Sequence, residues 1–347
     1  MLGLFSTIHD FSNALHAPFA PLAPFAPLAT AAALALLIDR LLGEPPARWH
    51  PVVWMGRGLG WAGARIAPRA PTPRDFCSFW LSALVWCALA AITLGASWGL
   101  QWAALQLPLA PAALLLALLL KPLLAWRMLA AEVGAVEVAL AQSLAAGRAR
   151  LAWLVSRDVA ALDAAQVRES AIESLAENLN DSVVAPLFWF AVAGLPGAAL
   201  YRFANTADAM WGYPGMHGGR YWQWAGKWAA RADDVLSWLP ARLTALLLAA
   251  FAGWPPRAAQ RVPLRTLRRE AARTPSPNSG WPMAAMALAL GVRLGKPGVY
   301  QLHGAGRAAQ AGDVQAALHL AQKVPLALFS LALAASVLIV FGDAFWL

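Results

Sequence analysis

The sequence is poor in charged residues. Only 13% of its 347 residues are charged, whereas 60% are hydrophobic. Soluble domains average about 25% charged and about 45–50% apolar residues. This composition excludes an ordinary soluble enzyme of the same length. We therefore expect an all-α, polytopic integral membrane protein.

Cysteine and histidine are also scarce. The two cysteines, Cys77 and Cys87, lie ten residues apart in one apolar stretch, which predicts buried small hydrophobic side chains and no disulfide. The six histidines show no metal-ligand spacing, so nothing supports a zinc enzyme. Basic residues interleaved with aromatics are missing too, and we expect no nucleic-acid partner.

Long apolar stretches fill much of the chain. A helix needs about 20 apolar residues to cross the hydrocarbon, and the stretches that approach this length are 23–38, 76–99, 103–125, 182–203, 235–253 and 324–343. The first begins in a proline-rich run, and Gly194-Leu195-Pro196-Gly197 interrupts the fourth, as in a broken or re-entrant helix. We predict about four to six membrane-embedded helices, some of them re-entrant, together with cytoplasmic amphipathic helices.

The ends of the chain and its charges suggest an organisation. Residues 1–22 read as a Pro/Ala-rich, poorly ordered leader, and 23–347 as a single membrane-embedded domain. All 27 Lys and Arg residues lie at or after residue 40, with clusters at 40–74, 127–168 and 257–273, and none lies in 100–110. The positive-inside rule places those clusters on the cytoplasmic side of the inner membrane. The lipid bilayer is thus a predicted partner.

Four carboxylates recur at every fourth residue, at Glu169, Glu173, Glu177 and Asp181. On a helix such residues share a face, and like charges at this spacing repel. A metal ion, basic residues from elsewhere in the fold, or raised pKa values must compensate them. Carboxylate oxygens suit a hard cation such as Mg²⁺. An ordinary solvated helix face is the alternative.

Other polar clusters interrupt the apolar background. Asn205, Thr206 and Asp208 follow an apolar stretch directly, where polar side chains are costly unless they bind something. Asp233 and Asp234 follow Arg231 and could alternatively be acidic residues at a helix start. The remaining clusters contain Asp39, His50, Arg157, Asp158, Arg242, Ser276 and Asn278.

The polar residues together suit phosphate and divalent-metal chemistry. Carboxylates can hold the ion, while arginines and helix N-termini hold phosphoryl oxygens. No Walker A motif or kinase glycine loop is present, so any nucleotide site must be unconventional. From these residues alone, we predict a membrane protein with a polar site on its cytoplasmic side.

Six motifs in order resemble a known family. They are Asp39…Gly43-Glu44-Pro45-Pro46…His50-Pro51, then Arg157-Asp158, then Glu173-Ser-Leu-Ala-Glu177-Asn178…Asp181, then Asn205-Thr206-Ala-Asp208, then Arg231-Ala-Asp233-Asp234…Arg242, and finally Ser276-Pro277-Asn278. The sequence is similar in these motifs, over about residues 30 to 323, to the membrane-bound CobD/CbiB proteins, the adenosylcobinamide (phosphate) synthases of cobalamin biosynthesis.

The resemblance implies an ATP-dependent amide ligase. Such an enzyme joins adenosylcobyric acid, a corrinoid, to (R)-1-amino-2-propanol or its O-phosphate, with ATP as co-substrate and Mg²⁺ as metal ion. Other membrane-associated enzymes of the late cobalamin pathway are further implied partners. A transporter, or a related membrane protein without ligase activity, is the alternative; a transporter would show inverted repeats, and the two halves of the chain show no convincing duplication.

The resemblance also implies roles for individual residues. The implied catalytic residues are Glu173, Asn178, Asn205, Arg231, Asp233 and Asp234, with Asp233 or Asp234 as the base. The implied substrate-binding or phosphate-binding residues are Asp39, His50, Arg157, Asp158, Thr206, Arg242, Ser276 and Asn278. The implied metal ligands are Glu173, Glu177, Asp181 and Asp208.

Overall fold

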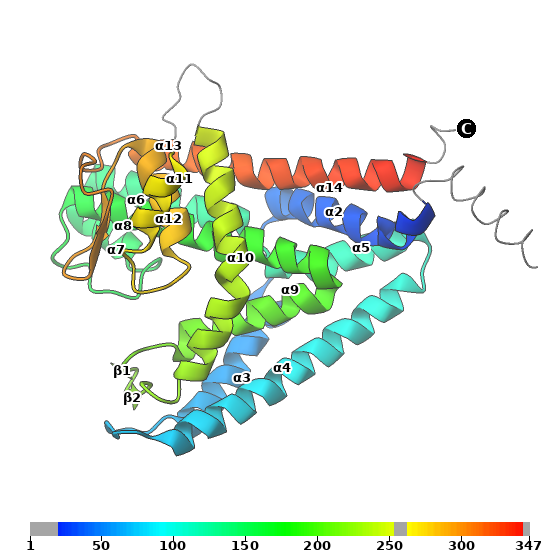
Figure 1. Ribbon diagram of the computed structural model, residues 1–347, viewed down its shortest axis with the longest axis horizontal. Coiled ribbons are helices and arrows are strands. Elements are labelled where there is room, and N and C mark those ends of the chain that lie inside the picture. The colour runs from blue at the N-terminus through cyan, green and yellow to red at the C-terminus, as the bar shows by residue number, and fades with distance from the viewer. Residues whose placement is uncertain (1–19, 253–261, 343–347) are drawn as a thin grey trace, which may run out of the picture.

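A computed structural model describes residues 20–252 and 262–342 (Figure 1), and it is almost entirely helical. The predicted leader falls mostly on residues 1–19, which lie outside the described residues. The α-helices are α2 (Ala26–Leu42), α3 (Pro51–Ile66), α4 (Phe76–Leu105), α5 (Leu109–Leu120), α6 (Trp126–Gln142), α7 (Leu144–Leu151), α8 (Ala164–Leu179), α9 (Ala185–Trp211), α10 (Lys227–Ala252), α11 (Leu264–Ala271), α12 (Gly280–Leu290), α13 (Asp313–Ala321) and α14 (Lys323–Phe341).

Short elements connect these helices. Three are 3₁₀ turns, η1 (Ala20–Phe25), η2 (Ala47–Trp49) and η3 (Lys121–Leu123), and one is a π-helical turn, η4 (Asn180–Val184). Two antiparallel hairpins pair β1 (Met216–His217) with β2 (Arg220–Tyr221) and β3 (Leu294–Lys296) with β4 (Tyr300–Leu302).

Six helical segments are long and apolar enough to cross a membrane. They are Leu22–Leu42, Phe76–Leu105, Leu109–Gln142, Ala164–Trp211, Lys227–Ala252 and Asp313–Phe341. Each overlaps one of the six apolar stretches found in the sequence. The prediction of an all-α, multi-pass membrane protein is confirmed.

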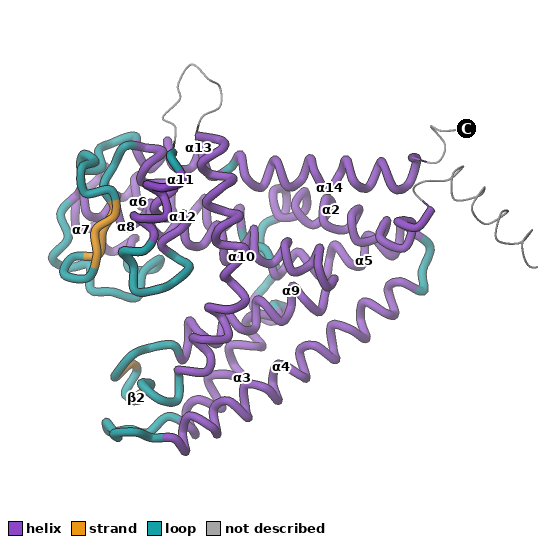
Figure 2. The backbone as a smooth tube through the Cα atoms, in the orientation of Figure 1, coloured by secondary structure: helices purple, strands orange, loops and turns teal. Residues whose placement is uncertain are grey.

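Three of the membrane helices run side by side, and the polar segments gather at one end of the molecule. In Figure 1, α2, α5 and α14 lie side by side, and α2 packs against both of the others. Most loops lie at the left of Figure 2, together with α6, α7 and α8, while the turn between α4 and α5 lies at the right. The described parts of the basic clusters thus lie toward the opposite end of the molecule from the uncharged 100–110 segment.

Helix α9 is a hairpin of two helical legs. Ala193 and Gly194 leave the helical conformation, and Gly194 has a φ of +66°, which favours glycine. The Tyr201 and Asn205 side chains then lie beside Asp181, so the chain has reversed its direction. The first leg, 185–192, is about 12 Å long and cannot cross a bilayer about 30 Å thick. The predicted interruption of this segment is confirmed.

Helix α10 crosses the other membrane helices. In Figure 1 it runs steeply across the direction of α2, α5 and α14. Pro240 lies inside it, where the missing N–H opens the helical hydrogen-bond ladder. The Trp189 indole donates to the Leu236 carbonyl at 3.0 Å and fixes α10 to the first leg of α9. This arrangement agrees with the expected tilted or re-entrant segments.

The structure corrects the prediction that the cysteines are buried. Cys77 and Cys87 are free and exposed on α4. Only 22% of the apolar window of this helix is buried within the protein, because α4 packs along one narrow face and turns the rest outward. The pattern of apolar residues could not distinguish a core face from an outward one.

A side chain from α4 caps the apex of the α9 hairpin. Gln101 Oε1 accepts a hydrogen bond from the Leu195 backbone N–H at 2.6 Å. We expect Gln101→Leu to lower the free energy of unfolding by about 1–3 kcal/mol, because a buried backbone donor loses its partner. Gln106→Leu is the matched control, since Gln106 is exposed and bonds only within α4. Equal melting temperatures for both variants in detergent would contradict this role.

Candidate active site

The π turn η4 joins α8 to α9 and directs Asp181 toward the hairpin. Asp163 and Gln166 form a capping box at the start of α8. The helix then continues through Asn180–Val184 with π-helical hydrogen bonding. Such turns are rare in proteins, and those that occur often lie at functional sites.

Asp181 ties the π turn η4 to the second leg of the α9 hairpin. Its Oδ1 atom accepts from the Tyr201 hydroxyl at 3.2 Å and from Asn180 Nδ2 at 2.8 Å. Its Oδ2 atom accepts from Asn205 Nδ2 at 3.1 Å. Arg202 Nη1 donates to the Asp181 backbone oxygen at 2.9 Å. The carboxylate is therefore fixed in position by donors from three other residues.

An acidic pocket of about 330 Å³ opens beside Asp181. Five carboxylates line it, from α8, η4, α9 and α10, and they are Glu177, Asp181, Asp208, Asp233 and Asp234. Asn205, Ser276 and Asn278 line it as well. The fold thus brings eight of the predicted site residues into one cavity, from segments far apart in the sequence.

Asp233 and Asp234 lie in the interior of α10 and do not cap it. The helix begins at Lys227, and its first turn contains no acidic residue. The Asn205 amide lies between two of the carboxylates. Its Nδ2 atom is 3.5 Å from Asp233 Oδ1 and 3.1 Å from Asp181 Oδ2. The alternative that these aspartates simply start a helix is therefore excluded.

The loop that carries Asn278 covers the acidic pocket. Asn278 Nδ2 donates to the Asp234 backbone oxygen at 2.7 Å, and Arg242 Nη1 donates to Asn278 Oδ1 at 3.0 Å. The Arg242 guanidinium also lies 4.8 Å from the centre of the Trp281 ring. Arg242 lines neither this pocket nor the mixed pocket described next, and its visible role is to hold the loop.

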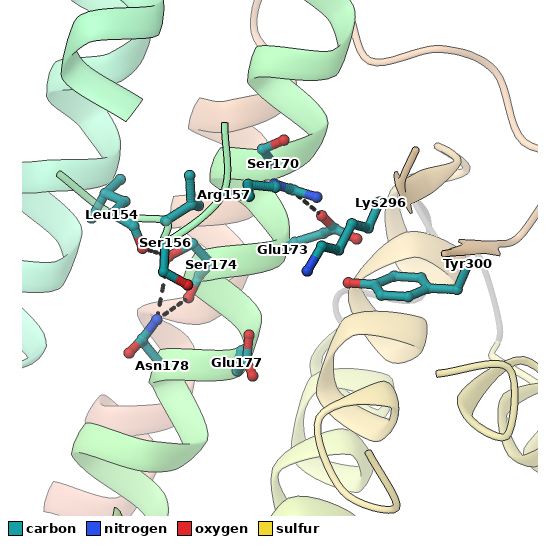
Figure 3. Close-up of a pocket in the computed structure, with 11 residues that line it drawn as sticks. Leu154, Ser156, Arg157, Ser170, Glu173, Ser174, Glu177, Asn178, Lys296 and Tyr300 are labelled. Atoms are coloured by element: carbon teal, nitrogen blue, oxygen red, sulfur yellow. Dashed lines mark hydrogen bonds and ion pairs between the residues drawn. The ribbon is translucent and has the colours of Figure 1, made fainter. Parts of the chain in front are cut away.

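A second cavity of about 180 Å³, the mixed pocket, adjoins the acidic pocket (Figure 3). Arg157 approaches from the loop before α8, and Lys296 and Tyr300 come from the β3–β4 hairpin. Glu173, Glu177 and Asn178 of α8 also line it, together with three serines. Glu177 lines both pockets and is the residue that joins them.

The mixed pocket contains buried polar atoms without partners. Arg157 Nη2 binds Glu173 Oε2 at 2.8 Å, but Arg157 Nε and Glu173 Oε1 are buried and have no hydrogen-bond partner in the described structure. Burial, followed by the charges of Glu173 and Glu177, raises the pKa of Tyr300. Its hydroxyl therefore keeps its proton and can donate a hydrogen bond to a bound anion.

The four carboxylates at positions 169, 173, 177 and 181 form a stripe along one helix face, which we call the carboxylate stripe. Basic residues from elsewhere in the fold compensate two of the four. Arg157 pairs with Glu173, and Arg293 lies 3.4 Å from Glu169. Glu177 has no ion pair or hydrogen bond within residues 20–252 and 262–342. The uncompensated part of the stripe is thus the part that faces the acidic pocket.

The acidic pocket offers suitable donors for Mg²⁺. Within the described residues, no group of three or more His, Cys, Asp or Glu side chains is arranged as a preformed metal site. Mg²⁺ usually takes only one or two carboxylates, with water and substrate phosphates completing its shell. Asp181, Asp208 and Glu177 fit this chemistry, whereas Glu173 is paired with Arg157 and lies outside the acidic pocket.

Comparison with known proteins places this chain in a family. The family model described as CobD/Cbib protein matches residues 32–325. The chain belongs to this family. Its relatives include the cobalamin biosynthesis protein CobD of Chromobacterium violaceum, 46% identical over 76% of this chain and 80% of that protein. The CobD of Brucella anthropi is 38% identical over 88% of this chain and 96% of that protein.

An archaeal relative shows the same likeness. The probable cobalamin biosynthesis protein CobD of Thermococcus kodakarensis is 42% identical over 78% of this chain and 84% of that protein. No solved structure matches the fold.

Several predicted site residues line neither pocket. Asp158 is exposed and accepts from the Ala160 N–H, and Arg231 is exposed on α10. The Thr206 hydroxyl bonds to the Arg202 carbonyl within α9. Asp39 and His50 belong to a separate cluster. The roles implied for these residues stay predictions.

The separate cluster is a network of charges at the end of α2. Lys121 Nζ, which is buried, lies 3.1 Å from Asp39 Oδ1 and 2.8 Å from Glu44 Oε1. His50 Nε2 lies 3.2 Å from Glu44 Oε2. Burial raises the pKa of Glu44, but the hydrogen bonds from His50 and Lys121 outweigh it and leave the pKa below its ordinary value.

Sequence reasoning missed Lys296, Tyr300 and Arg202. Gly295-Lys296-Pro297-Gly298 is a turn sequence that predicts a tight hairpin, but nothing in it indicates that the hairpin reaches α8. Tyr201 and Arg202 adjoin the Asn205 motif, yet only the reversal at Gly194 places them beside Asp181.

The Arg157–Glu173 pair should stabilise the mixed pocket. Glu173 is 3% exposed, so Arg157→Gln leaves a buried carboxylate without its cation. We expect a loss of about 3–5 kcal/mol in the free energy of unfolding, partly restored in the Arg157→Gln/Glu173→Gln double variant. Asp158→Asn, at the exposed neighbouring position, should be neutral. An unchanged melting temperature for Arg157→Gln would refute the importance of this pair.

Proposed function

We propose that this protein is an ATP-dependent amide ligase of cobalamin biosynthesis. It would join the propionate carboxylate of adenosylcobyric acid to (R)-1-amino-2-propanol or its O-phosphate. The observation that carries the proposal is the junction at Glu177, where a pocket lined by five carboxylates meets a pocket that contains Arg157 and Lys296. The names of the relatives as cobalamin biosynthesis proteins support the pathway.

The two pockets suit the two halves of such a reaction. The acidic pocket would hold the nucleotide phosphates, with Asp181 and Asp208 as ligands of Mg²⁺, which would neutralise phosphoryl charge there. Arg157, Lys296 and the Tyr300 hydroxyl would bind an anionic substrate group in the mixed pocket. Asn178, Asn205 and Asn278 would orient the substrates through their amides.

The proposed chemistry has two steps. A carboxylate oxygen of the corrinoid attacks the terminal phosphorus of ATP, which forms an acyl phosphate and releases ADP. The amine nitrogen then attacks the acyl carbon, phosphate leaves, and the amine proton passes to Asp233 or Asp234. Both aspartates line the acidic pocket and are free of ion pairs within the described residues, which suits them to accept a proton.

We also propose that the site faces the cytoplasm from the inner membrane. ATP is cytoplasmic, and both pockets lie at the end of the molecule where the basic segments gather. Enzymes of the late cobalamin pathway that are bound to the same membrane are suitable partners on that side.

The proposal is tested by a defined reaction. Purified full-length protein with cobyric acid in its adenosylated form, ATP, Mg²⁺ and either amine should form the amide and release one ADP per product. Corrinoid-dependent ADP release is the deciding measurement. Corrinoid binding without any ATP turnover would contradict the ligase and favour a transporter, for which the α9 hairpin is the supporting feature.

Glu177 provides a sharper test of the site. We expect Glu177→Gln to lower turnover at least about 100-fold, since it removes the carboxylate shared by both pockets. The melting temperature should not fall, because Glu177 makes no ion pair or hydrogen bond within the described residues. Glu169→Gln, two helical turns away on the same helix, is the matched control and should keep near-normal turnover. Normal turnover by Glu177→Gln would remove Glu177 from the site.

The orientation can be measured by labelling. Met216, in the connection between α9 and α10, is 52% exposed. A Met216→Cys variant, in a background with Cys77→Ala and Cys87→Ala, should react with an impermeant maleimide only after the cells are opened. Labelling in intact cells would place the α9–α10 connection outside and contradict a cytoplasmic site.

A further inference from the structure

A third polar cavity lies away from the active site, at the C-terminal end of α2 and the N-terminal end of α14. It has a volume of about 390 Å³, and Arg40, Arg127, Trp126, Gln315 and Gln322 supply its polar lining. No acidic residue lines it. We call it the basic pocket. Neither the proposed ligase chemistry nor the six sequence motifs assign it a role.

The two arginines of the basic pocket are largely unpaired. Arg40 is exposed in the last turn of α2 and makes no hydrogen bond or ion pair within residues 20–252 and 262–342. Arg127 donates from one guanidinium nitrogen to the Leu41 carbonyl, and its other guanidinium nitrogens stay free within the same residues. The pocket therefore carries uncompensated positive charge and fits an anion.

An apolar groove continues from the basic pocket. A cavity of about 100 Å³ between α2 and α14 is lined by Leu36, Leu37, Leu326 and Phe329. Arg40 and Trp126 line both cavities, so one runs into the other. The one acid in the groove, Asp39, already contacts Lys121 and accepts from the Arg127 backbone N–H at 3.0 Å.

The position of these cavities matches the boundary of a bilayer. Both α2 and α14 are long and apolar enough to cross a membrane. Figure 1 shows them side by side, with the end of α2 and the start of α14 at the side where the polar segments gather. Tryptophan and arginine near the ends of membrane helices are suited to the headgroup layer.

We infer that the basic pocket and the groove together bind an anionic phospholipid. The phosphate would lie between Arg40 and Arg127, and an acyl chain would enter the groove between α2 and α14. The Gln315 and Gln322 amides both contact His319, and they can also bond a headgroup hydroxyl. The shared chemistry is a phosphate ester, whereas the groove favours a lipid over a free phosphate.

The test uses delipidated full-length protein in neutral detergent and native mass spectrometry. Phosphatidylglycerol should bind more tightly than phosphatidylcholine with the same acyl chains. Arg40→Gln should weaken phosphatidylglycerol about fivefold, and Arg40→Gln/Arg127→Gln about thirtyfold, given the weight of one arginine near an anionic headgroup. Phosphatidylcholine binding should not change.

Two controls make the result decisive. Arg57→Gln removes one exposed charge from α3, outside both cavities, and should bind phosphatidylglycerol like the unchanged protein. Glycerol 3-phosphate tests the headgroup without the acyl chains. Equal affinity for both lipids, full binding by the double variant, or binding of glycerol 3-phosphate as tight as that of the lipid would each overturn the proposal.

Discussion

The hydrogen bonds of Asp181 hold the candidate site together. They join the π turn after α8 to the second leg of the α9 hairpin, through Tyr201 and Asn205. A half-buried carboxylate is costly unless it is paired or hydrogen-bonded, and the side chains of Asn180, Tyr201 and Asn205 donate to this one. The second leg of the hairpin places Asp208 in the acidic pocket, and α10 contributes Asp233 and Asp234 to the lining of the same pocket.

This arrangement explains why the carboxylate stripe is not uniform. The first two acids of the stripe, Glu169 and Glu173, face Arg293 and Arg157 and form ion pairs. The other two, Glu177 and Asp181, face the acidic pocket, where no cation lies among its lining residues. Folding thus places two carboxylates where a substrate or ion can compensate them. The first half of the helix face forms structural ion pairs, and the second half lines the acidic pocket.

The sequence predicted the membrane class, the interruption at Gly194 and, as site residues, all five carboxylates of the acidic pocket. Those predictions rest on local properties of the sequence. They are the length of the apolar stretches, the glycine and proline residues that interrupt a helix, and the clustering of polar side chains. It could not predict that Lys296 and Tyr300 reach α8, because this contact depends on packing between segments more than 100 residues apart in the chain. Nor could it show that Arg242 holds the Asn278 loop and lines neither the acidic nor the mixed pocket, since a charge alone does not reveal its partner.

The most direct measurement is a cryo-EM structure of the protein in nanodiscs with a nonhydrolysable ATP analogue, Mg²⁺ and adenosylcobyric acid. We expect nucleotide phosphates in the acidic pocket and the corrinoid carboxylate beside Glu177, at the junction with the mixed pocket. Density for the nucleotide away from Glu177 and Asp181 would contradict it.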